Sequence, residues 1–236
     1  MATLTELVTA IQDILKDNAY TETNIVSKIN ALVSRIAGGV RMPDGDVSPP
    51  LSDLFSYGKI DTSITLPCVS LPIDYQRNVF NVYDTSNCRI NPPAGGNYYS
   101  FGLFLKQISN LALTEAGSIY RVCVKGNKIY YQGIPSVSTI LGLHYYRKPI
   151  AMALDGDEPD GIPGHLAEDL IKHGVIKEIY GDIIEAGVTE PSHGAEYHTT
   201  KFYEAMTNLC DFIGNTDVVP KYYGSGDFMD AGICDG

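Results

Sequence analysis

Histidine and carboxylate side chains recur every four residues in the segment HLAEDLIKH. His165, Asp169 and His173 would therefore lie on one face of a helix, where they could ligate a metal ion or act as an acid and base. Their order differs from the HExxH pattern of zinc hydrolases, and the segment specifies no third ligand. His193 and His198 could complete such a site in space, but nothing in the sequence requires it. We therefore predict solvated polar side chains beside an apolar stripe, and no metal site.

The loop just before this segment, DGDEPDG, carries the carboxylates of Asp155, Asp157, Glu158 and Asp160. Alternating carboxylates are a feature of calcium loops, which also need a glutamate at the twelfth loop position. That position holds Leu166. The loop is therefore predicted to be a solvated acidic turn.

Other catalytic signatures are missing from the sequence. It contains no GxxxxGK[ST], GxGxxG or GxSxG motif, and no two of its five cysteines form a CxxC pair. We therefore predict no enzymatic activity and no cofactor.

Tyrosine is abundant, with 16 residues against no tryptophan, and many of these tyrosines occur in adjacent pairs. Half-buried strand faces explain part of this pattern. Tyrosine also supplies a large contact area at low entropic cost, which favours protein–protein contacts. The segment NPPAGGNYYSFG, residues 91–102, is a candidate contact loop. The candidates for contacts between subunits or with a tail are Tyr98, Tyr99, Phe101, Tyr130 and Tyr131.

The formal charge is −11 and the sequence pI is about 4.8. Clamping of nucleic acid needs clustered lysine and arginine, so specific binding of DNA is not expected, although an acidic wall could let DNA pass. No apolar run approaches the length of a membrane span, and the N-terminus lacks the features of a signal peptide. We expect the chain to stay in the compartment where it is made.

Four helices are predicted, two at each end of the chain. The first follows the capping box Thr3-x-x-Glu6, and the second begins near TETN and ends at Gly38-Gly39. The third opens at Pro163 and ends before Pro191, and the fourth carries an apolar face between residues 197 and 213.

The middle of the chain is predicted to be antiparallel β structure. Residues 120–131 form a hairpin around Gly126-Asn127, and the prolines of SITLPCVSLP place it at a sheet edge or a strand end. A third strand, STILGLHYYR, is expected to pair back and complete a meander. The fold class is α+β, a bundle of N- and C-terminal helices with an inserted antiparallel β subdomain. The expected divisions are 1–40, a helical hairpin; 41–150, the β subdomain; 151–216, the closing helices; and 217–236, a tail.

These features together resemble the head-to-tail adaptor, or connector, proteins of tailed bacteriophages, and in particular the tail accessory and tail tubular adaptors of short-tailed phages. The resemblance spans about residues 2–216. Its specific residues are Leu71-Pro72-x-Asp74-Tyr75, Tyr146-x-Lys148-Pro149 and the acidic turn with Pro159 and Pro163. In such adaptors residues 144–166 would be the seam that returns the chain from the β subdomain to the helices.

The resemblance implies a structural virion protein of the neck or tail, made in the host cytoplasm. It would form a ring, a dodecamer in the virion, between the portal protein and tail or nozzle proteins, and DNA would pass through without specific binding. C-terminal elements would engage the portal, with the docking candidates Lys221, Tyr222, Tyr223, Phe228 and Met229. Two alternatives stay open: a carbohydrate-binding or cell-surface β module that uses Tyr98, Tyr99 and Phe101, and a metal hydrolase built on His165, Asp169 and His173.

Overall fold

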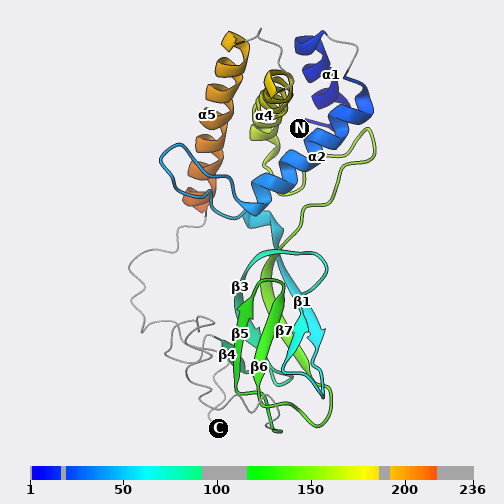
Figure 1. Ribbon diagram of the computed structural model, residues 1–236, viewed down its shortest axis with the longest axis vertical. Helices are drawn as coiled ribbons and strands as arrows, with labels where there is room; N and C mark the ends of the chain where they lie inside the picture. Colours follow the sequence, from blue (N-terminus) through cyan, green and yellow to red (C-terminus); the bar gives the residue numbers. More distant parts are fainter. Residues whose placement is uncertain (1, 17–19, 92–115, 186–191, 217–236) are drawn as a thin grey trace. The chain divides into compact units, whose positions relative to one another are not determined.

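The computed structural model describes residues 2–16, 20–91, 116–185 and 192–216 (Figure 1). The chain divides into two compact units. The helical unit contains the described residues up to Leu54 and from Lys148 onward, and the β unit contains those from Phe55 to Arg147. Helices at both ends of the chain and antiparallel sheets in the middle confirm the predicted α+β fold class.

The helical unit begins with helix α1, Leu4–Leu15, and helix α2, Glu22–Gly38. The predicted capping box is present: the Thr3 hydroxyl accepts the Glu6 amide, and the Glu6 carboxylate accepts the Thr3 amide at 2.9 Å. Thr21 caps α2, and Gly39 ends it with a φ of 103°. Both predicted N-terminal helices are therefore confirmed.

Helix α4, Gly164–Glu185, lies at the centre of this unit, in contact with α1, α2 and α5, Ser192–Thr216 (Figure 1). A helix with neighbours on three sides must be apolar around most of its circumference. Its fully buried residues accordingly cover more than the single stripe that the sequence indicates: Ala167, Leu170, Ile171, Val175, Ile176 and Ile179. At Gly174, an added Cβ would lie 2.5 Å from Leu32 and 2.9 Å from Phe202. Glycine at this position therefore lets α2 and α5 approach α4 closely.

The β unit consists of two antiparallel sheets. The first has the strand order β1-β7-β3-β4, with bounds Phe55–Asp61, Ile140–Arg147, Tyr75–Tyr83 and Arg89–Asn91. The second has the order β2-β6-β5, with bounds Cys68–Ser70, Lys128–Gln132 and Arg121–Lys125. Leu141 and Leu143 of the first sheet and Val122 and Ile129 of the second belong to one buried cluster. The two sheets therefore share a core as a sandwich.

Two local predictions for this unit are confirmed. Lys125 and Lys128 are partners across a two-residue turn, and Gly126 has a φ of 60°, which suits glycine at the first turn position. The short strand β2, in the proline-interrupted segment, lies at the edge of its sheet.

The predicted meander is wrong. Strand β7 does not continue the β5–β6 sheet but lies between β1 and β3 in the other sheet. Its buried residues Leu141, Leu143 and Tyr145 belong to the same core cluster as the hairpin residues Val122 and Ile129. By joining the opposite sheet, β7 packs them against the inner face of the hairpin.

Candidate functional site

A buried pair of imidazoles joins helices α4 and α5. Nδ1 of His173 lies 2.8 Å from Nδ1 of His198, and these side chains are only 9% and 6% exposed. One ring must donate and the other accept, so the contact holds a single proton between two neutral rings. Tyr180 and Tyr197 pack against the pair, with ring centroids 5.8 Å and 5.2 Å from that of His198.

An open cavity of about 600 Å³ lies beside this pair, and its lining includes Ile14 of α1 and charged residues of α4 and α5. Lys172 donates to Asp169 at 2.8 Å, and Lys201 donates to Glu204 at 2.6 Å. Each lysine therefore has a carboxylate partner on its own helix. Both ion pairs lie within a single helix, so of these three contacts only the imidazole contact joins α4 to α5.

The surroundings set the charge state of the pair. Burial lowers the pKa of His173, and the neighbouring Lys172 lowers it further. Burial lowers the pKa of His198 as well, with His173 as the next cause. The hydrogen bond from Lys172 lowers the pKa of Asp169. The lowered pKa values favour neutral rings near neutral pH, in which one Nδ1–H is donated to the other Nδ1.

The environment of these histidines was predicted only in part from the sequence. His165, Asp169 and His173 were predicted to be solvated, but His173 is buried, and His165 packs against Phe212 with ring centroids 5.2 Å apart. The described residues contain no group of three or more histidine, cysteine, aspartate or glutamate side chains that could hold a metal ion. The side chain of His193 lies outside the described residues. The arrangement of His165, Asp169 and His173 therefore does not support the alternative of a metal hydrolase.

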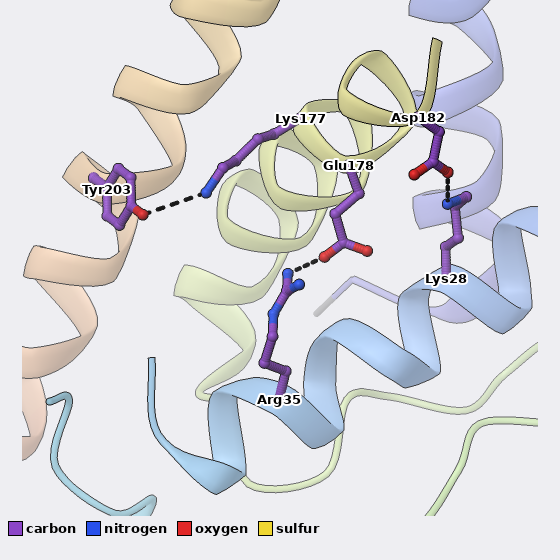
Figure 2. Close-up of polar contacts among 6 residues, drawn as sticks. All are labelled: Lys28, Arg35, Lys177, Glu178, Asp182 and Tyr203. Carbon is purple, nitrogen blue, oxygen red and sulfur yellow. Dashed lines mark hydrogen bonds and ion pairs between the residues drawn. The ribbon is translucent and has the colours of Figure 1, made fainter. Parts of the chain in front are cut away.

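Polar contacts also connect α4 to α2 and α5 (Figure 2). Asp182 pairs with Lys28 at 2.6 Å, and Glu178 pairs with Arg35. The α4 residue number falls as the α2 number rises, so the two helices run antiparallel along this seam. On the opposite side of α4, Lys177 reaches the hydroxyl of Tyr203 on α5 at 3.4 Å.

The acidic loop is more than a solvated turn, and that prediction is wrong for part of it. Backbone carbonyls of Asp155 and Asp157 accept the amides of Thr5 and Leu4, at 3.3 and 2.8 Å. The first amides of a helix have no partner within the helix. The loop therefore caps α1 from 150 residues away in the sequence.

Side chains hold this loop in shape. The Asp157 carboxylate accepts the amides of Ala153 and Leu154 at 2.7 and 2.8 Å, and these bonds lower the pKa of Asp157. Asp160 accepts the Ile150 amide at 2.7 Å. Asp155 and Glu158 remain exposed.

Asn30 of α2 fixes the start of the same segment. Its side-chain amide donates to the Met152 carbonyl at 2.9 Å and accepts the Met152 amide at 2.8 Å. Neither Asn30 nor the capping carbonyls gave any signal in the sequence, because each contact joins residues more than 100 positions apart.

The motif LPIDY now has a structural explanation. Leu71 is buried in the β core, and Asp74 accepts the hydroxyl of Tyr145 at 2.8 Å. Burial and the Asp74 carboxylate raise the pKa of Tyr145 to about 12. The Tyr75 ring packs on that of Tyr145 with centroids 6.1 Å apart. The motif thus fastens the start of β3 to the central strand β7.

Tyr131, one of the candidate contact residues, is a core residue of the β unit and only 2% exposed. Its hydroxyl accepts the Ser63 amide at 2.7 Å and lies 2.9 Å from the Leu66 carbonyl. Its cross-strand partner is the buried Val122, so the strand register directs this ring toward the core between the two sheets. Tyr130, on the opposite face of β6, is partly exposed.

The remaining predicted contact residues lie outside the described residues. They are Tyr98, Tyr99 and Phe101 in the candidate contact loop, and Lys221, Tyr222, Tyr223, Phe228 and Met229 in the tail. Within the part of the chain that the structure describes, no helix is long and apolar enough to cross a membrane.

Comparison with known proteins identifies the family of the chain. A search of curated proteins found no match. The family model described as SU10 adaptor protein matches residues 2–222, nearly the whole chain. It covers both the helical unit and the β unit, and therefore the buried histidine pair, the capping loop and the LPIDY motif. The chain belongs to the SU10 adaptor protein family, and it is a phage adaptor protein.

Proposed function

We propose that this protein is a structural component of the virion that forms a ring between the portal and the tail and lines the passage for DNA. The observation that carries the proposal is the family match over residues 2–222, because an adaptor must bind other structural proteins of the phage. A ring requires a heterologous interface, in which one face of a subunit meets a different face of the next. The resemblance to connector proteins implies twelve copies.

The charge of the chain is compatible with a DNA passage. A net charge of −11 repels a polyanion, so duplex DNA would pass without being captured. The proposal assigns no catalytic step to any residue. Membership of the adaptor family supports a structural role, and two of the candidate histidines, His173 and His198, join two helices.

The tail is proposed to dock on the portal through Lys221, Tyr222, Tyr223, Phe228 and Met229. The family match ends at residue 222, so it includes Lys221 and Tyr222 but not Tyr223, Phe228 and Met229. A variant that lacks residues 217–236 tests the assignment. It should form rings less readily on the portal, and unchanged portal binding would refute this role.

The mass of the full-length protein, alone and mixed with the portal protein of the same phage, tests the whole proposal. Analytical ultracentrifugation should detect a complex of fixed stoichiometry that forms with the portal. A chain that does not bind the portal protein would contradict the proposal. Glycan-array binding by that chain would then favour the carbohydrate-binding module.

A further inference from the structure

Charge is segregated between the two units of this chain. Residues 55–147 contain eight lysines and arginines against four aspartates and glutamates, a net charge of +4. Residues 1–54 and 148–218 contain eight basic residues against 21 acidic ones, a net charge of −13. An acidic protein with pI near 4.8 therefore carries a basic segment, and that segment forms the β unit.

The basic charge has an exposed tip at the β5–β6 hairpin. Lys125, Gly126, Asn127 and Lys128 are all exposed, and the two lysines are direct cross-strand partners. Like charges directly opposite each other destabilise a strand pair. A hairpin that nevertheless keeps two lysines here presents a concentrated positive charge at its end.

The tip is held in place before it meets any partner. The Asn127 carbonyl accepts the Leu71 amide at 2.8 Å, and Leu71 itself is buried in the β core. An added Cβ on Gly126 would meet no atom within 4 Å, so the turn projects into open space. Docking of a fixed tip costs little conformational entropy.

We propose that the β5–β6 hairpin tip of one subunit docks on the acidic helical unit of a second copy of the chain. The inference rests on the ring proposed above and names one of its contacts. Charge complementarity selects the partner: each copy carries +4 on one unit and −13 on the other, which suits the unlike faces of a heterologous interface. Duplex DNA would also attract two lysines, but the net charge of −11 opposes its approach.

Zero-length carbodiimide cross-linking tests the contact directly, because it joins only lysines and carboxylates that touch. Unlabelled and ¹⁵N-labelled full-length chains are mixed, and mass spectrometry identifies cross-linked peptides that pair the two isotopes. The experiment is run on the chain alone and on its assembly with the portal. We expect mixed-isotope links from Lys125 or Lys128 to carboxylates of residues 1–54 or 148–216. Absence of such links in both samples would overturn the proposal.

Charge reversal gives an independent readout. The double variant Lys125→Glu/Lys128→Glu should weaken ring assembly by about tenfold at low salt, with a smaller effect at high salt. The matched control Lys16→Glu/Arg41→Glu changes the net charge equally, at exposed positions of the helical unit. It should assemble at least as well as the unmodified chain. Reversal of the cross-linked carboxylate to lysine should restore assembly of the first variant.

The outcomes separate this contact from the ring itself. If both double variants assemble on the portal like the unmodified chain, the proposed docking contact is refuted, whereas the proposed ring is not. If the unmodified chain does not assemble on the portal, the proposed function fails. If Lys125→Glu/Lys128→Glu instead abolishes binding to a labelled DNA duplex that the unmodified chain binds, the tip is a DNA contact and the proposal falls.

Discussion

His173 on α4 and His198 on α5 share one proton across 2.8 Å inside the helical unit. Because the contact needs one ring as donor and the other as acceptor, it exists only while both rings are neutral or carry one extra proton between them. The α4–α5 contact is thus linked to the pH range in which histidine titrates.

Acidification should destabilise the helical unit through this pair. Burial lowers the pKa of both rings in the folded state, so the unfolded chain binds protons more readily. The stabilisation is present above the unfolded histidine pKa, about 6.5, and is lost as the pH falls below it. Urea unfolding followed by circular dichroism between about pH 7 and pH 5 measures this loss. Two-dimensional NMR of the histidine rings separates the pair from His144, whose pKa is also lowered by burial.

Substitution distinguishes the hydrogen bond from simple packing. His173→Leu should cost about 1–3 kcal/mol at neutral pH, because it leaves a buried nitrogen of His198 without a partner. The double variant His173→Leu/His198→Leu should cost less than the sum of the single variants and lose the pair's share of the pH dependence. Additive costs with an unchanged pH profile would contradict the shared proton.

Sequence periodicity predicted the helices well because each carries its signals locally. Thr3 and Glu6 form a capping box within one turn, and Gly39 ends α2 immediately after its last apolar turn. The position of α4 could not be predicted in the same way. Its burial on several sides depends on contacts with α1, α2 and α5, which lie elsewhere in the chain.

Long-range pairing limited the prediction of the β unit and of the site. The β5–β6 hairpin follows from a two-residue turn, whereas β7 pairs with strands that begin about 65 and 85 residues earlier, for which no local signal exists. The same reason explains His198, which lies 25 residues from His173. Helical spacing pointed from His173 to Asp169 instead, on the same helix.

Gly174 should tolerate no larger residue without loss of stability. A Cβ there would overlap Leu32 and Phe202, which are both buried. Overpacking costs about 1–3 kcal/mol, and the gain in helix propensity from Gly→Ala offsets about 1 kcal/mol of it. Gly174→Ala should therefore lower the free energy of unfolding by about 1 kcal/mol.

Gly181→Ala on the same helix is the matched control, because an added Cβ there meets nothing within 4 Å. It should raise that free energy by up to about 1 kcal/mol, and equal effects of the two changes would contradict the packing at Gly174.

Removal of the Asp157 carboxylate should loosen the N-terminus of α1. This side chain fixes the loop whose carbonyls accept the amides of Leu4 and Thr5. In Asp157→Ala, hydrogen exchange at those two amides should become faster, with little change in the middle of α4. Glu158→Ala is the matched control, since it removes a carboxylate from an exposed position of the same loop. Equal exchange rates in both variants would mean that the carboxylate does not support the cap.

Tyr131→Phe should destabilise the β unit through a single oxygen. The hydroxyl accepts the Ser63 amide at 2.7 Å and donates to a carbonyl of the same segment, so its loss leaves partly buried groups unpaired. We expect a cost of about 1–3 kcal/mol in the free energy of unfolding. Tyr57→Phe is the matched control, because its ring is 48% exposed and a surface change of this kind alters stability by less than about 0.5 kcal/mol. Thermal unfolding of both variants measures the difference. If Tyr131→Phe matched Tyr57→Phe, the ring alone would hold the segment around Ser63, and the hydroxyl would contribute nothing.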